Sequence, residues 1–484
     1  AREMVDGGPI DVLTGDYLAE LPMYIFSKTK ERRPDGGFAR SFVGQMGDVL
    51  GDCLDRGFKV VSIAGALDPR GCAAAVQQVA EARGWSPRIA VVTGDDLLPR
   101  LGELQAAGLD LAHLDTGEPL GDMAERMLTA NAYLGGWGIA DALGQGADVV
   151  ITGRVTDAAV VVGPAAWHHG WARDDWDALA GAVVAGHVIE CGAQATGGNY
   201  SFFADVPDLT HAGFPWAEIA EDGSSVIGKH DGTGGEVSVG TVTSQLLYEI
   251  GGHRYANPDV VARFDTIAIA EAGPDRVHLS GTKGEPAPDT LKVAMNYSGG
   301  WKNSFAVGLT GLDLDEKVAL VEDTLWDACA FDPEDFEAVN AEVVGRPEHD
   351  PSDNAAATCF YRITVRDQDP KKVGRAFSSA AVETALSSIP GYFGLTPPGA
   401  GSEYPVNWPT LVPADVVGHE VHFEDSVTPI PHPEGSAPVV EGDDPWARTA
   451  IHREWGETEW APLGAVLGAR SGDKGPNANL GVFT

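Results

Sequence analysis

The first 200 residues alternate short runs of β-branched residues with alanine-rich stretches of helical periodicity. A chain in which strands and helices alternate forms a mostly parallel sheet with crossover helices, because parallel neighbours need a connection long enough to hold a helix. The pattern predicts strands at 58–63, 88–93 and 147–152, and helices at 72–83, at 130–144 and from Leu97 onward. We therefore predict an α/β fold for this region.

The pattern changes after residue 255 to that of an α+β layer. A helix at 241–250 is predicted before this boundary. After it, strands are predicted at 290–297 and 359–365, and helices at 314–330 and 373–386. The stretch 413–445 is rich in Pro, Glu, Asp and Gly, which is typical of an extended linker, with one strand at 418–423. We divide the chain into an α/β region at 1–255, a second α+β region at 256–412, a linker at 413–459, and a small C-terminal module at 460–484 that starts with a strand at 465–467.

The chain is strongly acidic, with 33 Lys and Arg against 71 Asp and Glu and a formal charge of -38. This charge repels a phosphate backbone, and no window concentrates enough Lys or Arg to reverse it, so nucleic acid is excluded as a partner. The acidity fits either a saline habitat or ordinary solubility. No segment carries 18 consecutive apolar residues, which excludes a membrane-spanning helix. Five cysteines without a paired spacing predict a reducing, cytoplasmic location and no metal site.

The densest cluster of reactive side chains lies among glycines at 186–199. Glu190 is a candidate general acid or base, and Cys191 a candidate nucleophile. Gln194 and Thr196 could donate hydrogen bonds to a carbonyl, while glycines let the backbone approach a ligand closely. The alternative is a structural turn, with a buried thiol and a paired carboxylate. The candidate residues of this cluster are Glu190, Cys191, Gln194, Thr196, Gly197 and Gly198.

Polar side chains also follow the predicted strands, where ligands bind in open parallel sheets. Asp16 follows the run Val12–Gly15, and Arg154 and Asp157 follow Thr152 and Gly153. Arg154 could clamp a carboxylate while Asp157 orients it or takes a proton. Alternatively, the two side chains pair with each other and hold the loop.

Two further stretches are candidates for holding an anionic group. The glycine-rich turn Gly232, Thr233, Gly234 and Gly235 could present amide N–H groups to a phosphate or carboxylate, although hairpins use the same residues. The polar stretch 469–479 carries Arg470, Asp473 and Lys474, and two cations so close together are unusual in so acidic a chain. A solvated hairpin is the alternative for this stretch.

The chain resembles the acyclic terpene utilisation family (AtuA type). The motifs that carry the resemblance lie at 8–20, 146–154, 190–198, 232–235, 388–393 and 470–475. The resemblance implies a large α/β N-terminal region and a small ferredoxin-like C-terminal domain, which is cut short here. It also implies a cytoplasmic enzyme associated with the breakdown of branched or isoprenoid acyl-CoA thioesters. The reaction it implies is carbon-carbon lyase chemistry on a 3-hydroxy-3-methylglutaryl-like thioester.

Residues and resemblance together favour an enzyme acting on a branched acyl-CoA thioester or a related carboxylate, by lyase, hydratase or hydrolase chemistry next to a carbonyl. The base would be Glu190 or Asp157, and the stabilising groups Arg154, Gln194 and Thr196. The turn at 232–235 and Lys474 would hold the anionic part of the substrate. The sequence does not identify a cofactor, although coenzyme A could enter as part of the substrate, and we expect a homo-oligomer.

Two alternatives remain open from the sequence. The chain could be a non-catalytic subunit or scaffold that binds an acyl-CoA, or a thioester hydrolase that uses Cys191. The enzymatic hypothesis requires the loops of Asp16, Arg154, Glu190 and Thr233 to line one cavity.

Overall fold

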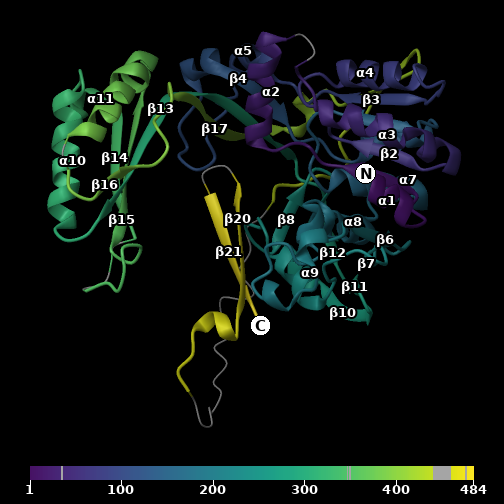
Figure 1. Cartoon of the computed structure of the whole chain (residues 1–484). Helices are drawn as coiled ribbons and strands as arrows, with labels where there is room; N and C mark the ends of the chain where they lie inside the picture. Colours follow the sequence, from purple (N-terminus) through teal and green to yellow (C-terminus); the bar gives the residue numbers. More distant parts are fainter. Residues whose placement is uncertain (34–35, 346, 348–349, 388, 440–458, 475–476) are drawn as a thin grey trace. The chain divides into compact units, whose positions relative to one another are not determined.

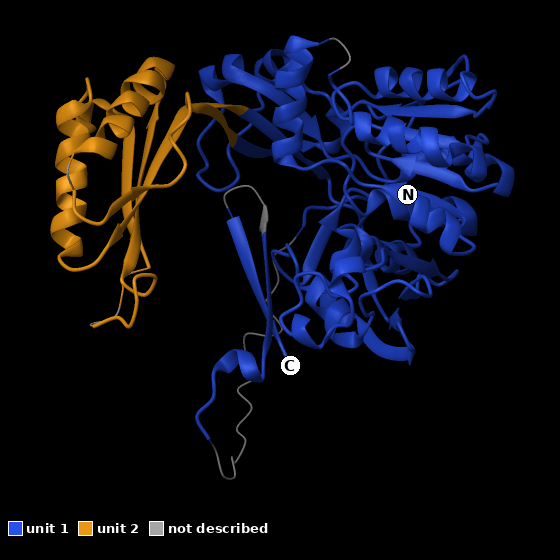
Figure 2. Cartoon of the chain, in the orientation of Figure 1, with its two compact units in different colours: residues 1–296, 407–484 blue, residues 297–406 orange. Residues whose placement is uncertain are grey.

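The computed structural model describes residues 1–33, 36–345, 347, 350–387, 389–439, 459–474 and 477–484. The chain forms two compact units (Figure 2), one made of residues 1–296 and 407–484 and the other of residues 297–406. The fold is mixed α/β with several sheets. The four-part division made from the sequence stays a prediction. No helix among the described residues combines the length and apolar character needed to span a bilayer.

A six-stranded sheet in the first unit carries the α/β pattern (Figure 1). Its strands, in spatial order, are β1 (Val12–Gly15), β2 (Lys59–Ser62), β5 (Val149–Thr152), β3 (Ile89–Thr93), β18 (Glu420–Phe423) and β19 (Ser426–Pro429). The first four are parallel, as the alternating sequence pattern predicts. The predicted strand at 418–423 is β18, which pairs antiparallel with β3 and extends this sheet.

Helices pack on this sheet because their apolar faces are matched to its β-branched residues. Phe42, Met46 and Val76 share one buried core with Val60 and Ile151 of the sheet. The helices that contribute to this core are α3 (Arg40–Arg56) and α4 (Pro69–Glu81), whereas α6 (Trp137–Gly144) and α7 (Ala159–His169) also contact its strands. The remaining α-helices before β5 are α1 (Arg2–Gly7), α2 (Glu20–Arg32) and α5 (Leu101–Ala106).

The predicted helix at 130–144 is wrong in its first part. Residues before the glycine pair at 135–136 form strand β4 (Met127–Ala132), and α6 begins only at Trp137. The strand pairs with β13 (Thr290–Thr310), and the Tyr133 N–H donates to the Lys292 carbonyl at 2.9 Å. Alanine content alone predicted a helix, but pairing with a strand distant in sequence overrides that weak propensity.

Helix α8 (Trp176–Ile189) is the centre of the rest of the first unit. It is apolar on every side, and its buried residues from Ala178 to Val188 form one core with the strands around it. Those strands are β6 (Pro215–Ile219), β7 (Ser225–Lys229), β10 (Ala268–Gly273) and β11 (Arg276–Ser280) in one sheet, and β8 (Arg254–Asn257), β9 (Val260–Arg263) and β12 (Lys283–Glu285) in another. Helix α9 (Val239–Leu246) overlaps the helix predicted at 241–250 but begins two residues before it and ends four residues before its end.

The second unit combines one sheet with helices, and the division into an α/β region and an α+β layer stays a prediction. Its sheet contains β14 (Ala338–Val344), β15 (Thr358–Asp367), the later part of β13 and β16 (Tyr392–Gly394), and β17 (Ser402–Pro413) also pairs with β13. Helices α10 (Leu314–Ala328) and α11 (Phe377–Glu383) share a core with this sheet. The predicted helix at 373–386 is interrupted, because Gly374 has a non-helical ψ of -113°.

The chain ends in a two-stranded hairpin of β20 (Gly468–Lys474) and β21 (Asn477–Phe483). The predicted strand at 465–467 is wrong, because Leu463–Ala465 form a single 3-10 turn and β20 starts at Gly468. The hairpin contacts α9 of the first unit (Figure 1). A ferredoxin-like C-terminal domain stays a prediction.

Candidate functional site

A pocket of about 580 Å³ opens in the first unit beside the carboxyl end of β5. This is the end of a parallel sheet at which ligands bind. The pocket combines charged side chains with an apolar wall, as small-molecule sites do. Its charged residues are Asp157, Glu249, Asp289 and Lys292, and its aromatic and aliphatic side chains include Tyr133, Tyr255, Leu291, Leu411 and Val439.

Asp157 is the sequence-predicted site residue that lines the pocket. Its Oδ1 lies 2.8 Å from the Arg154 Nη1, and the Arg154 side chain is only 3% exposed. The guanidinium also lies over the Tyr133 ring, 4.1 Å from its centroid. Burial alone would lower the pKa of Arg154, but Asp157, Tyr133 and Asp16 hold it above its ordinary value. Arg154 therefore pairs with Asp157 and does not reach the pocket wall itself.

The loop of Arg154 and Asp157 is held by a buried carboxylate at the end of β3. Asp95 Oδ2 accepts hydrogen bonds from the Arg154 N–H at 2.8 Å and from Asn131 Nδ2 at 2.7 Å. Burial raises the pKa of Asp95 to about 6, although the hydrogen bonds from these two donors act to lower it. Asp95 thus joins the ends of β3, β4 and β5, so that the position of Asp157 is set by three segments of the chain.

Lys292 supplies the cation of the pocket, and the sequence did not identify it. Its Nζ lies 3.7 Å from Glu20 Oε1 and 5.2 Å from the centroid of the Tyr133 ring. The Tyr133 hydroxyl donates to the same carboxylate at 3.0 Å, and burial raises the pKa of Tyr133 to about 12. A lone lysine in an otherwise apolar strand, Leu291-Lys292-Val293-Ala294, is the sequence signal that points to this position.

Glu190 and Cys191 follow α8 and do not line the pocket. The Glu190 side chain is 5% exposed, with Oε1 3.6 Å from Nδ1 of the fully buried His187. Burial raises the pKa of Cys191 to about 12, and the carboxylates of Glu190, Glu249, Asp16 and Asp157 add to the effect. The structure thus gathers these acidic groups around Cys191, and the thiol stays protonated at neutral pH.

The residues that follow Cys191 use their polar groups inside the protein. The Thr196 hydroxyl donates to the Gly213 carbonyl at 2.7 Å, and Gln194 accepts a hydrogen bond from Arg470. Gly197 has φ +109°, and a Cβ there would lie 2.7 Å from the Val206 side chain. A Cβ on Gly198 would lie 2.9 Å from the Ala193 carbonyl oxygen. None of these residues lines the pocket.

The turn at 232–235 likewise uses its N–H groups within the chain. Gly234 donates to the His211 carbonyl at 2.9 Å, and Gly235 donates to the Pro207 carbonyl at 2.8 Å. The Thr233 N–H and hydroxyl both point to the His230 carbonyl, at 3.5 and 2.8 Å. With the N–H groups of Thr233, Gly234 and Gly235 bonded within the chain, this is a structural turn between β7 and α9 that packs against Thr196 and contributes no residue to the pocket.

The third polar stretch forms the β20–β21 hairpin. The Arg470 guanidinium lies 4.1 Å from the centroid of the Tyr248 ring, and Arg470 is buried. The side chains of Asp473 and Lys474 lie outside the part of the chain that the structure describes. Among the described residues, no group of three or more His, Cys, Asp or Glu side chains has the geometry to hold a metal ion.

A match to a known protein family identifies the family of the chain. Residues 1–423 match the family described as acyclic terpene utilisation family protein AtuA. The chain belongs to this family. No curated protein and no solved structure matches it. The family match contains every pocket residue named above except Val439, and it ends before the hairpin.

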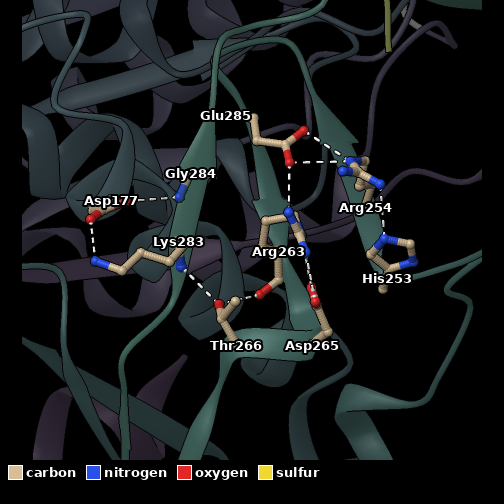
Figure 3. Close-up of polar contacts among 9 residues, drawn as sticks. All are labelled: Asp177, His253, Arg254, Arg263, Asp265, Thr266, Lys283, Gly284 and Glu285. Atoms are coloured by element: carbon tan, nitrogen blue, oxygen red, sulfur yellow. Dashed lines mark hydrogen bonds and ion pairs between the residues drawn. The ribbon is translucent and has the colours of Figure 1, made fainter. Parts of the chain in front are cut away.

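In this AtuA family member, an ion-pair network holds the strand that forms one wall of the pocket (Figure 3). Arg254 of β8 and Arg263 of β9 both bind Glu285 of β12, at 3.0 and 2.8 Å. Arg263 also binds Asp265 at 2.6 Å. Because Tyr255 directly follows Arg254, the network sets the position of a residue that lines the pocket.

Replacing Glu285 with glutamine should lower the free energy of unfolding by about 1–2 kcal/mol at pH 7, because two charged hydrogen bonds weaken on a partly exposed group. Burial alone would raise the pKa of Glu285, but Arg254 and Arg263 hold it below its ordinary value. The stabilisation is therefore present above about pH 4.3 and disappears as the pH falls through the lowered pKa. Urea unfolding at pH 7 and pH 3 measures this difference.

The matched control is Glu218→Gln, because Glu218 pairs with Arg276 at 3.9 Å between two well-exposed side chains. This variant should lose less than about 0.5 kcal/mol at either pH. Equal losses for the two variants at pH 7 would show that the network at Glu285 does not stabilise the pocket wall.

Proposed function

We propose that this protein is an enzyme acting on a branched or isoprenoid acyl-CoA thioester, or a related carboxylate, by lyase or hydratase chemistry next to a carbonyl. Family membership implies a role in acyclic terpene catabolism. One observation carries the proposal: one pocket holds three carboxylates, among them Asp157 and Glu249, and the cation Lys292 beside apolar side chains such as Leu291. Acid-base groups and a hydrocarbon surface are what such a substrate needs.

Asp157 is the base in this proposal. In a retro-aldol cleavage, Asp157 takes the proton of the 3-hydroxyl group, the O–H electron pair forms the new C=O bond, and the bond between C2 and C3 breaks. Its electron pair moves to the thioester carbonyl as an enolate, which the ammonium group of Lys292 stabilises. Glu249, the second acid-base group of the pocket, donates the proton that C2 needs to give the shortened thioester, and solvent carries the proton from Asp157 back to Glu249. Glu190 was the other candidate base, but its carboxylate faces His187 and does not line the pocket.

The charge of the pocket restricts which part of the substrate it accepts. Three carboxylates and one ammonium line it, so the neutral acyl thioester fits better than the phosphates of coenzyme A. The volume of about 580 Å³ suits an acyl group of isoprenoid size. The coenzyme would then remain outside the pocket. The small-molecule substrate, the homo-oligomer and the cytoplasmic location stay predictions.

The test combines ligand binding with product analysis. Coenzyme A thioesters of branched 3-hydroxy acids should raise the Tm by several degrees at saturation, and free coenzyme A should raise it less. Mass spectrometry should then detect a shortened thioester, or the dehydrated or hydrated acyl group. Stabilisation without any product would support the non-catalytic acyl-CoA-binding subunit instead. No stabilisation and no product would overturn the proposal.

The thiol of Cys191 should be unreactive in the folded protein. With its pKa raised to about 12, the reactive thiolate is a minute fraction at pH 7.5. Iodoacetamide, followed by peptide mass spectrometry, should modify Cys191 only after unfolding in urea, which provides the positive control. Cys191→Ala should retain turnover. Rapid modification of the folded protein together with an inactive alanine variant would favour the cysteine hydrolase.

A further inference from the structure

The C-terminal hairpin touches the segment that carries Glu249, one of the two carboxylates assigned to the reaction. We propose that the β20–β21 hairpin positions Glu249 in the pocket wall, with Asn479 and Arg470 as the positioning residues. The catalytic meaning of this role rests on the proposed function, whereas the contacts themselves do not. The hairpin lies outside the family match at 1–423, so family membership does not assign it a role.

The backbone of Glu249 adopts a conformation that needs support. Its φ is +57°, in the left-handed region that non-glycine residues rarely occupy. Asn479 Oδ1 accepts a hydrogen bond from the Glu249 N–H at 3.0 Å, and Asn479 Nδ2 donates to the Leu247 carbonyl at 2.6 Å. One side-chain amide of the hairpin therefore binds the backbone on both sides of Tyr248 and stabilises the strained residue.

The hairpin also acts on the side chain of Glu249. The Tyr248 side chain is hydrogen-bonded to the Glu249 carboxylate, and burial, with this carboxylate, raises the pKa of Tyr248. Tyr248 therefore keeps its proton and can donate it to the hydrogen bond. The Arg470 guanidinium packs on the Tyr248 ring at 4.1 Å and also binds Gln194. Through Arg470, Gln194 of the predicted site cluster is joined to the segment that carries Glu249.

The fit between hairpin and pocket segment is close enough to require glycine. A Cβ on Gly472 would lie 2.5 Å from Glu249 Cγ and 2.7 Å from the Tyr248 ring. On the opposite strand, a Cβ on Gly481 would lie 2.5 Å from Leu247 Cβ. Ser201 Oγ adds a reciprocal pair of hydrogen bonds with the Ala469 backbone, at 2.7 and 2.8 Å. The hairpin thus packs against three consecutive residues, Leu247, Tyr248 and Glu249.

Hydrogen exchange of the full chain tests the proposal without any ligand. In Asn479→Ala, the Glu249 amide loses its acceptor and should exchange roughly tenfold faster, as expected for the loss of one hydrogen bond. The matched control is Asn477→Ala, because Asn477 lies on the same hairpin and binds Asp115 at 2.6 Å. Peptides covering residues 247–257 should exchange at the wild-type rate in this control.

A second pair of variants keeps the test independent of Asn479. Gly472→Ala forces the hairpin away from Tyr248 and Glu249, whereas Gly464→Ala adds a methyl group where no atom lies within 4 Å. Only the first should accelerate exchange at 247–257. Wild-type exchange in both Asn479→Ala and Gly472→Ala would overturn the proposal.

Enzyme turnover measures whether the hairpin positions Glu249 for the reaction. With a branched 3-hydroxyacyl-CoA, Asn479→Ala should lower kcat by roughly tenfold with little change in KM, because Glu249 is misplaced while the apolar wall persists. If the wild-type protein turns over no thioester but the exchange difference remains, the proposed function fails and the structural role of the hairpin stands. If turnover is normal in both hairpin variants, Glu249 needs no positioning and the proposal fails.

Discussion

Asp157→Asn should lower the turnover of a branched acyl thioester by about a thousandfold, because an amide cannot accept the proton that the carboxylate takes. Asp157 is the acidic candidate from the strand-end loops that lines the pocket, and its Oδ1 lies 2.8 Å from the Arg154 Nη1. The variant leaves Arg154 with a weaker partner, so its fold should be verified by circular dichroism below its Tm. Steady-state kinetics measures the loss.

Glu190→Gln is the matched comparison for Asp157→Asn. Glu190 is a buried carboxylate near the same site, but it faces His187 at 3.6 Å and does not line the pocket. Its loss should reduce kcat by about tenfold or less, since it acts through neighbouring groups. A thousandfold loss in Glu190→Gln, with Asp157→Asn nearly as active as the wild type, would assign the base to Glu190 instead.

The second large effect is on stability. Arg154→Met should lower the free energy of unfolding by about 3–5 kcal/mol, because it removes one partner of a buried ion pair. The side chains of Arg154 and Asp157 are 3% and 12% exposed, and the guanidinium also packs on Tyr133. Methionine preserves much of the apolar volume, so the loss reports mainly on the charge. Urea unfolding at pH 7 measures it.

Arg362→Met provides the control on the surface. Arg362 pairs with Glu342 across β14 and β15, where the two side chains are 53% and 38% exposed. Exposed pairs contribute about 0–1 kcal/mol, so this variant should unfold close to the wild type. If the two arginine variants lose similar free energy, Arg154 is not the buried anchor of the site.

The sequence predicted the parts of the fold that depend on local pattern. The strands at 58–63, 88–93 and 147–152 are confirmed as β2, β3 and β5, because buried parallel strands read as β-branched runs. The pattern could not show that the first residues of the predicted helix at 130–144 belong to β4, which pairs with β13 more than 150 residues later. Nor could it place β18 and β19, from the predicted linker, in the first sheet. The positions of these strands depend on pairing between segments that are distant in the sequence, and the local composition of a segment does not indicate its partner.

The candidate site, too, could be predicted from the sequence only in part. Arg154 and Asp157 were identified because side chains that follow parallel strands gather at one end of the sheet. The reactive cluster at 190–198 contains chemically suitable residues, but the packing at the end of α8 turns Glu190 toward His187. Lys292 and Glu249 reach the pocket from segments far along the chain, and the left-handed φ of Glu249 has no signature in its residue type.

A crystal structure with a non-cleavable thioether analogue of a branched 3-hydroxyacyl-CoA tests the central claim most directly. We expect the acyl group in the pocket beside β5, with its 3-hydroxyl within hydrogen-bond distance of the Asp157 carboxylate and its carbonyl oxygen next to Lys292. An acyl group bound elsewhere, with Asp157 out of reach of the hydroxyl, would contradict the account.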